Sequence, residues 1–283
     1  MPIKRDRSID TPDYEQDKMR NLVKLYARPR LRAPNMVAAW PGISNVSIIA
    51  ATYLLKVLDF KELGEIEPSY FFDPIGVSVK DNVVEAPQFP RSRFYYWKNK
   101  GGNSDIILFI GDDQPSAKGY ELVNCVLDVA LRFRVKRIYT CAAALTRIHH
   151  TEQPRVWGVG TRQEVVDELQ RYELLRKGNL QIAGLNGLLL GAAQERGMEC
   201  ACLLGEVPMY TSRIQNPMAA LAVLEVLAKL LQVEIDTTEL SLIALEANER
   251  MKEIAAEAMG EYIDYFTRPI WESGQEEEEE EDN

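Results

Sequence analysis

Hydrophobic positions along the chain fall into two alternating kinds of segment. Short, mainly apolar runs predict strands over 37–40, 63–66, 92–97, 105–111, 137–141, 156–159 and 199–204. Between them, apolar residues at helical spacing predict helices over 47–58, 120–133, 164–175, 184–195 and 217–231. Strands that alternate with helices are typical of an α/β protein. We therefore expect residues 34–235 to form an α/β core domain with a three-layer, doubly wound, mostly parallel sheet.

One predicted strand pair lies outside this alternation. Apolar residues over 75–79 and 83–84 flank the polar sequence Lys80-Asp81-Asn82. Asp and Asn tolerate the left-handed backbone conformation that tight hairpin turns require. The pattern predicts a β-hairpin.

The two ends of the chain differ from the core. Residues 1–33 are rich in charge, which predicts a loosely packed N-terminal arm; apolar spacing over 19–26 leaves a helix open as the alternative. Apolar residues every three or four positions predict one long C-terminal helix over 236–270. Its apolar stripe needs a cover, either the body of its own subunit or a neighbouring one. Residues 271–283 predict a disordered acidic tail.

Composition narrows the function classes. The net charge is −10 over 283 residues, and positions 276–282 contribute seven of the negative charges. The remainder is only mildly acidic, which argues against binding to nucleic acid. We expect no membrane span, no signal peptide, a cytoplasmic location, and no metal or cofactor. Cys200 and Cys202 lack metal-ligand or redox spacing and are expected in the core.

The strand over 37–40 ends at Trp40-Pro41-Gly42, and a helix follows with Asn45 or Ser44 as its expected N-cap. In wound sheets the loops after parallel strands meet at the carboxyl edge, where ligands and partners bind. Asn216 is expected to cap the helix that begins at Pro217. The candidate residues of a partner or ligand crevice at this edge are Trp40, Pro41, Gly42, Asn45, Gly111, Asp112, Pro208, Tyr210 and Asn216.

Catalytic chemistry remains the alternative use of the same edge. The chain contains no phosphate-binding glycine loop and no Gly-x-Ser-x-Gly sequence. An enzyme acting on a nucleotide or small metabolite would use Asp112 and Asp113 as magnesium ligands and His149 or His150 as base. Adjacent side chains are expected to diverge, so that at most one of the two histidines serves the site. Because the edge offers shape-giving residues rather than proton-transfer groups, we name no catalytic residue.

The order of several short motifs resembles a known family. These motifs are Trp40-Pro-Gly-Ile-Ser-Asn-Val46, Arg93-Phe-Tyr95, Leu108-Phe-Ile-Gly111, Arg137-Ile-Tyr-Thr-Cys141, Gly184-Leu-Asn-Gly187, and Val207-Pro-Met-Tyr210 with Asn216-Pro217. Over about residues 35–232 the chain is similar to the proteasome assembly chaperone 2 family. It departs from the family pattern at Gly42, where an Asp is usual, and at Met209, where a His is usual.

The resemblance implies a fold similar to nucleoside phosphorylases, a homo-oligomer, and a non-catalytic assembly chaperone or scaffold. It implies protein partners, such as proteasome-like clients. The chain lacks the hydrophobic–Tyr–any tripeptide with which some members end, so docking on a proteasome ring through the tail is not expected. Some relatives carry the label of ATP-dependent carboxylate–amine ligases, which the resemblance leaves as the enzymatic alternative.

Overall fold

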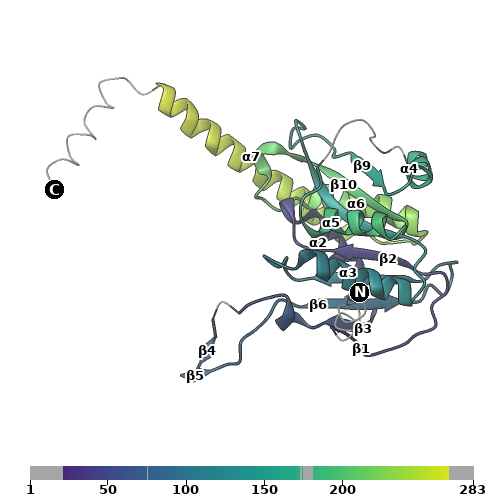
Figure 1. The fold of residues 1–283 in the computed structure, drawn as a ribbon. Coiled ribbons are helices and arrows are strands. Elements are labelled where there is room, and N and C mark those ends of the chain that lie inside the picture. The colour runs from purple at the N-terminus through teal and green to yellow at the C-terminus, as the bar shows by residue number, and fades with distance from the viewer. Residues whose placement is uncertain (1–21, 75, 173, 175–180, 268–283) are drawn as a thin grey trace, which may run out of the picture.

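The structure of the protein is a computed structural model, which describes residues 22–74, 76–172, 174 and 181–267, and their side chains as far as residue 253. Within these residues an eight-stranded sheet forms the centre of the molecule, in the order β1-β3-β6-β7-β2-β8-β10-β9 (Figure 1). Its strands are β1 (Val23–Leu25), β2 (Asn35–Ala39), β3 (Lys61–Ile66), β6 (Ser92–Trp97), β7 (Ile106–Gly111), β8 (Ile138–Thr146), β9 (Val156–Gly160) and β10 (Cys200–Pro208). The predicted α/β class is confirmed.

The sheet is mixed, with parallel pairing confined to its centre. Strands β7, β2, β8 and β10 pair in parallel, and β1, β3, β6 and β9 pair antiparallel to their neighbours. The expectation of a mostly parallel sheet therefore holds for the centre only. The connection between β6 and β7 is a short loop, and a parallel crossover needs a dozen or more residues, so this pair is antiparallel.

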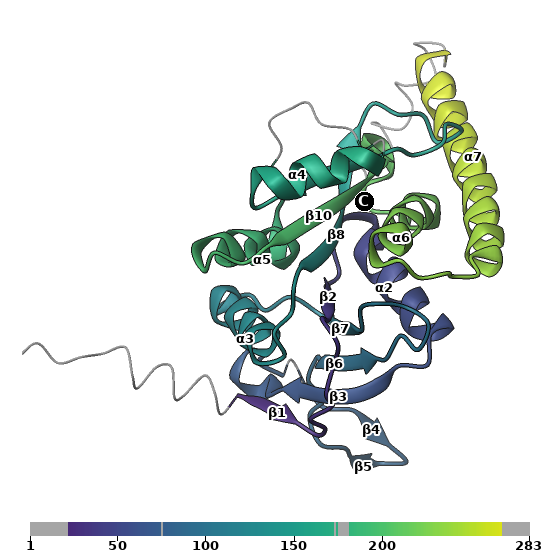
Figure 2. The same ribbon diagram turned by 90° about the vertical axis from the view of Figure 1, so that its right-hand side faces the viewer.

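Helices cover both faces of the sheet, which makes three layers (Figure 2). One core cluster joins the sheet to α2 (Val46–Val57) and α6 (Pro217–Leu231). The other core cluster joins it to α3 (Gly119–Arg132) and α5 (Gly184–Glu195). The short helix α4 (Gln163–Leu169) lies beside the edge strand β9. The four cysteines lie buried in the core and form no disulfide, as the sequence predicts for Cys200 and Cys202.

The long helix α7 (Thr238–Thr267) packs on its own subunit in its first half. Leu240, Ala244 and Met251 are buried, and α7 contacts α6. Beyond this contact the helix continues away from the body of the protein (Figure 1). Residues 268–270 of the predicted helix and the predicted acidic tail 271–283 lie outside the described residues. No helix in the described part of the chain is long and apolar enough to span a membrane.

Residues 23–25 differ from the loose arm expected for this end of the chain. They form β1, which pairs antiparallel with β3, and the Tyr26 amide donates to the Leu63 carbonyl at 2.9 Å. The free edge of β3 offers unpaired backbone groups, and β1 satisfies them. Val23–Leu25 is thus a strand and not part of a helix. Residues 1–21 lie outside the described part of the chain.

The predicted hairpin is confirmed as a separate two-stranded sheet. Strands β4 (Val79–Lys80) and β5 (Val83–Val84) pair antiparallel across Asp81 and Asn82, whose φ angles are 51° and 63°. Two consecutive positive φ angles are typical of the type I′ turn that suits a tight hairpin. The hairpin projects from the body on the side where α7 leaves it (Figure 1).

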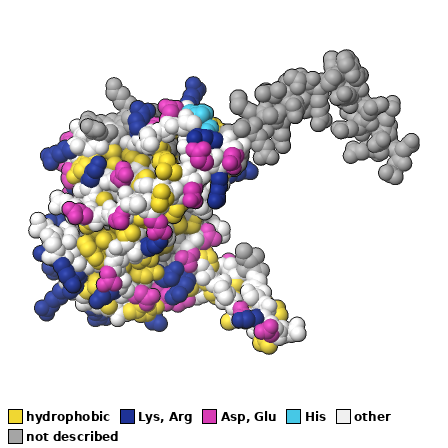
Figure 3. Space-filling model, turned by 180° about the vertical axis from the view of Figure 1, so that it is seen from behind, with side chains coloured by type: hydrophobic (Ala, Val, Ile, Leu, Met, Phe, Trp, Pro, Cys, Tyr) yellow, Lys and Arg dark blue, Asp and Glu magenta, His cyan; other side chains and the backbone are white. Residues whose placement is uncertain are grey.

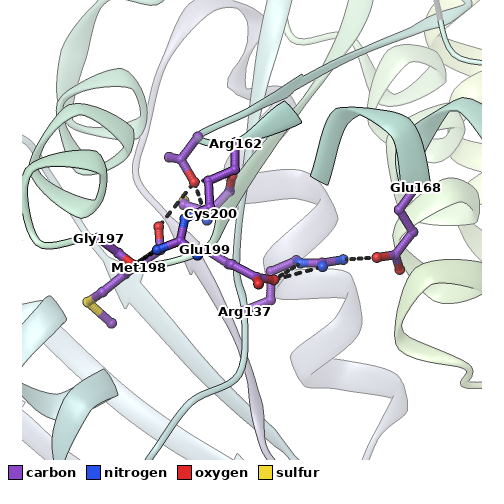
Figure 4. A network of polar contacts seen from close by, with 8 residues as sticks. Arg137, Arg162, Glu168, Gly197, Met198, Glu199 and Cys200 are labelled. Carbon is purple, nitrogen blue, oxygen red and sulfur yellow. Dashed lines mark hydrogen bonds and ion pairs between the residues drawn. The ribbon is translucent and has the colours of Figure 1, made fainter. Parts of the chain in front are cut away.

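Where β8 begins, the side chain of Arg137 joins this strand to neighbouring elements (Figure 4). Its guanidinium forms ion pairs of 2.8 Å with Glu199, beside β10, and 2.8 Å with Glu168 on α4, and its side chain is only 15% exposed. Burial alone would lower the pKa of Arg137. The bonds to Glu199 and Glu168 outweigh burial and raise that pKa above its ordinary value.

Replacement of Arg137 tests this junction. Arg137→Ala leaves two carboxylates near each other without their cation, so we expect the free energy of unfolding to fall by about 2–3 kcal/mol. Urea denaturation followed by circular dichroism measures the change. The exposed Arg213→Ala is the control, with an expected change within about 0.5 kcal/mol. Equal stability of the two variants would show that the Arg137 pairs add nothing.

Candidate functional site

Trp40 and Gly111 form the buried base of the carboxyl edge. Trp40 is fully buried after β2, and its ring centroid lies 4.9 Å from that of Phe109. A Cβ on Gly111 would lie 2.4 Å from the Trp40 ring, so only glycine leaves room for the indole at this position. Both residues therefore shape the edge from beneath rather than face a ligand.

Two side-chain amides hold the loop that follows Trp40. The Asn186 amide donates to the Trp40 carbonyl at 3.4 Å, and the Gln114 amide donates to the Pro41 carbonyl. The Gln114 side-chain oxygen accepts from the Leu185 amide at 2.9 Å, at the start of α5. Gln114 and Asn186 thus join the loops after β2 and β7 to α5. Sequence analysis missed both roles, although Asn186 lies within the Gly184-Leu-Asn-Gly187 motif.

Backbone hydrogen bonds join two short 3-10 helices at this edge, η1 (Ile43–Asn45) and η4 (Met209–Thr211). The Ser44 amide donates to the Ser212 carbonyl at 3.3 Å, and the Asn216 amide donates to the Ser44 carbonyl at 3.0 Å. The Ser44 hydroxyl donates to the Thr211 carbonyl at 3.3 Å. We call this set of bonds the Ser44 clasp. It fixes the loop after β2 against the loop after β10.

The two predicted helix caps have different outcomes. Asn216 is confirmed as the N-cap of α6, because its side-chain oxygen accepts from the Ala219 amide at 2.9 Å. The cap predicted for α2 is wrong. Asn45 occupies the N-cap position but makes no side-chain capping bond, and Ser44 uses its hydroxyl in the clasp. Both residues have φ angles of 52°, which aim their side chains differently from an ordinary capping residue.

The nine predicted crevice residues divide by burial. Trp40, Gly111, Pro208 and Asn216 are buried, Pro41 and Asn45 are partly buried, and Gly42, Asp112 and Tyr210 are exposed. Beside the exposed ones lie two apolar side chains that sequence analysis did not select. Ile43 is 42% exposed and Met209 is 59% exposed, next to Tyr210 at 58%. We call Gly42, Ile43, Met209 and Tyr210 the carboxyl-edge face.

The two histidines support Tyr210 from a third loop. Their rings do not diverge as expected, because the centroids of His149 and His150 lie 4.1 Å apart. The Tyr210 hydroxyl accepts from the His150 amide at 2.9 Å and lies 2.9 Å from its Nδ1. Partial burial lowers the pKa of His150, with smaller contributions from His149 and from Lys252 on α7. His150 therefore holds the Tyr210 hydroxyl through both its amide and its ring.

The carboxylates proposed for magnesium are already engaged. Asp112 accepts from the Arg91 amide at 3.0 Å and pairs with Arg93 at 3.2 Å. Asp113 accepts from the Gln114 amide at 2.7 Å. Across the part of the chain that the structure describes, no group of three or more His, Cys, Asp or Glu side chains is arranged to hold a metal ion. Asp112 instead fixes β6 against the loop after β7.

Comparison with known proteins identifies the family. The model of the PAC2 family matches residues 36–255, and the chain belongs to this family. The resemblance drawn from the motifs is thereby confirmed, and the fold agrees with solved PAC2 structures. An uncharacterised protein from Methanocaldococcus jannaschii is 28% identical over 209 residues, which cover 72% of this chain and 76% of the relative.

Two solved structures from Pyrococcus furiosus are similar over most of the chain. PbaB, described as an archaeal proteasome activator, has 29% identity and a TM-score of 0.70, with 82% of this chain and 98% of PbaB covered. PbaA, described as an archaeal homologue of a proteasome-assembly chaperone, has 27% identity and a TM-score of 0.63, with 84% of this chain and 99% of PbaA covered.

Substitution of Gly111 tests the base of the edge. Gly111→Ala forces its Cβ against the Trp40 ring, so we expect a loss of about 1–3 kcal/mol in the free energy of unfolding. A shifted Trp fluorescence maximum in the folded state should accompany the loss. Gly191→Ala is the matched control, because a Cβ there meets nothing within 4 Å in the interior of α5. It is expected to stabilise the protein by up to about 1 kcal/mol. Identical stabilities would contradict the close contact.

Proposed function

We propose that this chain is a non-catalytic assembly chaperone or scaffold that binds protein partners through the carboxyl-edge face. Membership of the PAC2 family supports a chaperone-like role. PbaB and PbaA are described as a proteasome activator and a homologue of a proteasome-assembly chaperone, which supports subunits of a proteasome-like particle as the partners. A cytoplasmic location is part of the same proposal.

The observation that carries the proposal is an exposed apolar face on loops that are already fixed. Ile43, Met209 and Tyr210 stand in solvent, yet the Ser44 clasp, Gln114 and Asn186 hold the backbone beneath them. Tyr and Met are enriched in the cores of protein interfaces. A face that is ordered before binding loses little conformational entropy when a partner docks. Both properties suit recognition of a protein surface.

The enzymatic alternative has less support at the same edge. It needs a carboxylate pair free to bind magnesium and a base beside it. Asp112 pairs with Arg93, and Asp113 accepts the Gln114 amide, so both carboxylates have structural partners. His150 contacts the Tyr210 hydroxyl. These contacts explain the polar residues of the edge without a catalytic role.

We further propose that the chain associates with itself through α7. Leu242 is 58% exposed and Leu245 is 56% exposed on the side of the helix that the subunit leaves uncovered. Apolar side chains repeated along a helix are favourably buried against a second helix. A second copy of the chain supplies such a helix. The resulting oligomer would carry one carboxyl-edge face on each subunit.

Light scattering after size-exclusion chromatography tests self-association. We expect a mass that is a multiple of the 32.1 kDa subunit at micromolar concentration. The variant Leu242→Glu with Leu245→Glu should reduce that mass, because buried charges oppose the contact. Leu188→Glu, at an exposed leucine on α5, is the control and should leave the mass unchanged. A monomeric wild-type chain would contradict the proposal.

Binding to a purified proteasome core particle from the source organism tests the partner role. Met209→Ala with Tyr210→Ala removes most of the carboxyl-edge face, so we expect binding at least about tenfold weaker in surface plasmon resonance, as for interface hot spots. Leu131→Ala serves as the control and should bind as the wild type does. Equal affinity of all three proteins would exclude the carboxyl-edge face as the binding surface, and no binding by the wild type would exclude this partner.

A further inference from the structure

Three neighbouring loops at the amino edge of the sheet, opposite the carboxyl-edge face, carry a concentrated positive charge. Three loops precede the parallel strands β2, β7 and β8 at this edge, and residues 28–32, 98–104 and 132–136 of these loops contain no Asp or Glu. In Figure 3 dark blue side chains gather along the left-hand edge, on the side away from the projecting hairpin. All eight cationic residues of the three segments are exposed: Arg28, Arg30, Arg32, Lys98, Lys100, Arg132, Arg134 and Lys136. We call this set the basic edge.

Hydrogen bonds hold these loops together as one surface. Buried Asp105 accepts from the Arg32 amide at 2.6 Å and from the Asn99 amide at 3.0 Å, which joins the first loop to the second. The Lys136 amide donates to the Pro34 carbonyl at 2.8 Å, which joins the third loop to the first. The cations are therefore presented at fixed positions rather than on a mobile segment.

Among the described residues, none of the eight cations of the basic edge forms an ion pair, although Asp59 lines one cavity with Lys98 and Lys100. Asp105 is buried and uses its carboxylate on backbone amides, while Glu199 and Glu168 pair with Arg137. Eight like charges in neighbouring loops repel one another, so a polyanion that docks there relieves the repulsion. The chain as a whole has a net charge of −10. Its most concentrated negative charge is the run at 276–282, with seven consecutive carboxylates.

We infer that the basic edge binds an acidic polypeptide segment, and that its occupant is the 276–282 run of a second copy of this chain. Complementary charge selects this occupant, because seven carboxylates in sequence match the spread of eight cations over three loops. The inference does not depend on the identity of any client. It concerns the basic edge alone, which shares no residue with the carboxyl-edge face.

Chain length favours an intermolecular contact. Helix α7 begins near the basic edge, since Gln232 and Lys136 line the same cavity and Thr238 follows six residues later. Its 30 residues extend for about 45 Å away from that start. From Thr267 to Glu276 the chain spans about 31 Å at full extension. Glu276 therefore lies beyond reach of its own basic edge, and Asp282, about 50 Å from Thr267 at full extension, reaches it only when the whole segment is stretched. The basic edge of a neighbouring copy has no such limit.

Fluorescence anisotropy with a labelled peptide of residues 274–283 tests the occupant. The receptor is the full chain with Glu276→Gln through Glu281→Gln, so that its own run does not compete. We expect binding that weakens at least about tenfold between 50 and 200 mM salt. A peptide with glutamine at the same six positions should not bind. No binding of the acidic peptide at low salt would overturn the inference.

Charge reversal locates the site. Lys98→Glu with Lys136→Glu in the receptor should weaken peptide binding at least tenfold. Lys80→Glu with Arg147→Glu changes the net charge equally at the hairpin and at the carboxyl edge, and should weaken it less than twofold. If both pairs of substitutions weaken peptide binding equally, the peptide responds to the net charge of the receptor alone, and the assignment of the site to the basic edge is overturned. Tighter binding of a ten-nucleotide single-stranded DNA than of the peptide would assign the basic edge to nucleic acid instead.

Mixing two full-length variants tests the intermolecular contact. The Lys98→Glu, Lys136→Glu chain keeps its acidic run, and the Glu276→Gln through Glu281→Gln chain keeps its basic edge. We expect the mixture to have a higher weight-average mass in light scattering than either variant alone. An unchanged mass would overturn the intermolecular assignment. The outcome is independent of proteasome binding, so failure here leaves the proposed function standing.

Discussion

The Ser44 clasp is the interaction on which the candidate site depends. Strands β2 and β10 are separated in the sheet by β8, and the loops that follow them are joined by the bonds of Ser44 to Ser212 and Asn216. Unpaired backbone groups at this partly buried position would be costly, so the bonds favour one arrangement of the two loops. The left-handed backbone at Ser44 and Asn45 is part of that arrangement and persists because its surroundings hold it.

Polar residues of the carboxyl edge bond to the protein's own backbone and side chains. Gln114 and Asn186 bind the carbonyls of Pro41 and Trp40, Asp112 binds Arg93, and Asn216 caps α6. What remains exposed is mostly apolar, from Ile43, Met209 and Tyr210. Such a distribution suits docking of a protein surface better than proton transfer, because catalytic groups must remain free to meet the reacting atoms.

The sequence predicted those features that depend on local pattern. Apolar runs and helical spacing located the strands and helices, Asp81-Asn82 located the hairpin turn, and Asn216 was identified as a helix cap.

Contacts between distant segments could not be predicted from these local patterns. The antiparallel flanks of the sheet, the use of Val23–Leu25 as an edge strand, and the Ser44 clasp each depend on contacts between residues far apart in the chain. The motif order placed the candidate residues at one edge of the sheet but could not separate Trp40, which is buried beneath that edge, from Met209, which is exposed on it. Likewise, a mild average charge concealed a basic edge that forms only when three separate loops meet.

Hydrogen–deuterium exchange of the free chain tests most directly whether the carboxyl edge is fixed before any partner binds. The Ser44 and Asn216 amides donate within the clasp, whereas the hairpin at 79–84 has exposed side chains and projects from the body. We predict that these two amides exchange at least about a hundredfold more slowly than those of the hairpin, as amides in cooperatively held structure do. Exchange of Ser44 and Asn216 at the hairpin's rate would show that the two loops move independently, and would contradict a preformed docking face.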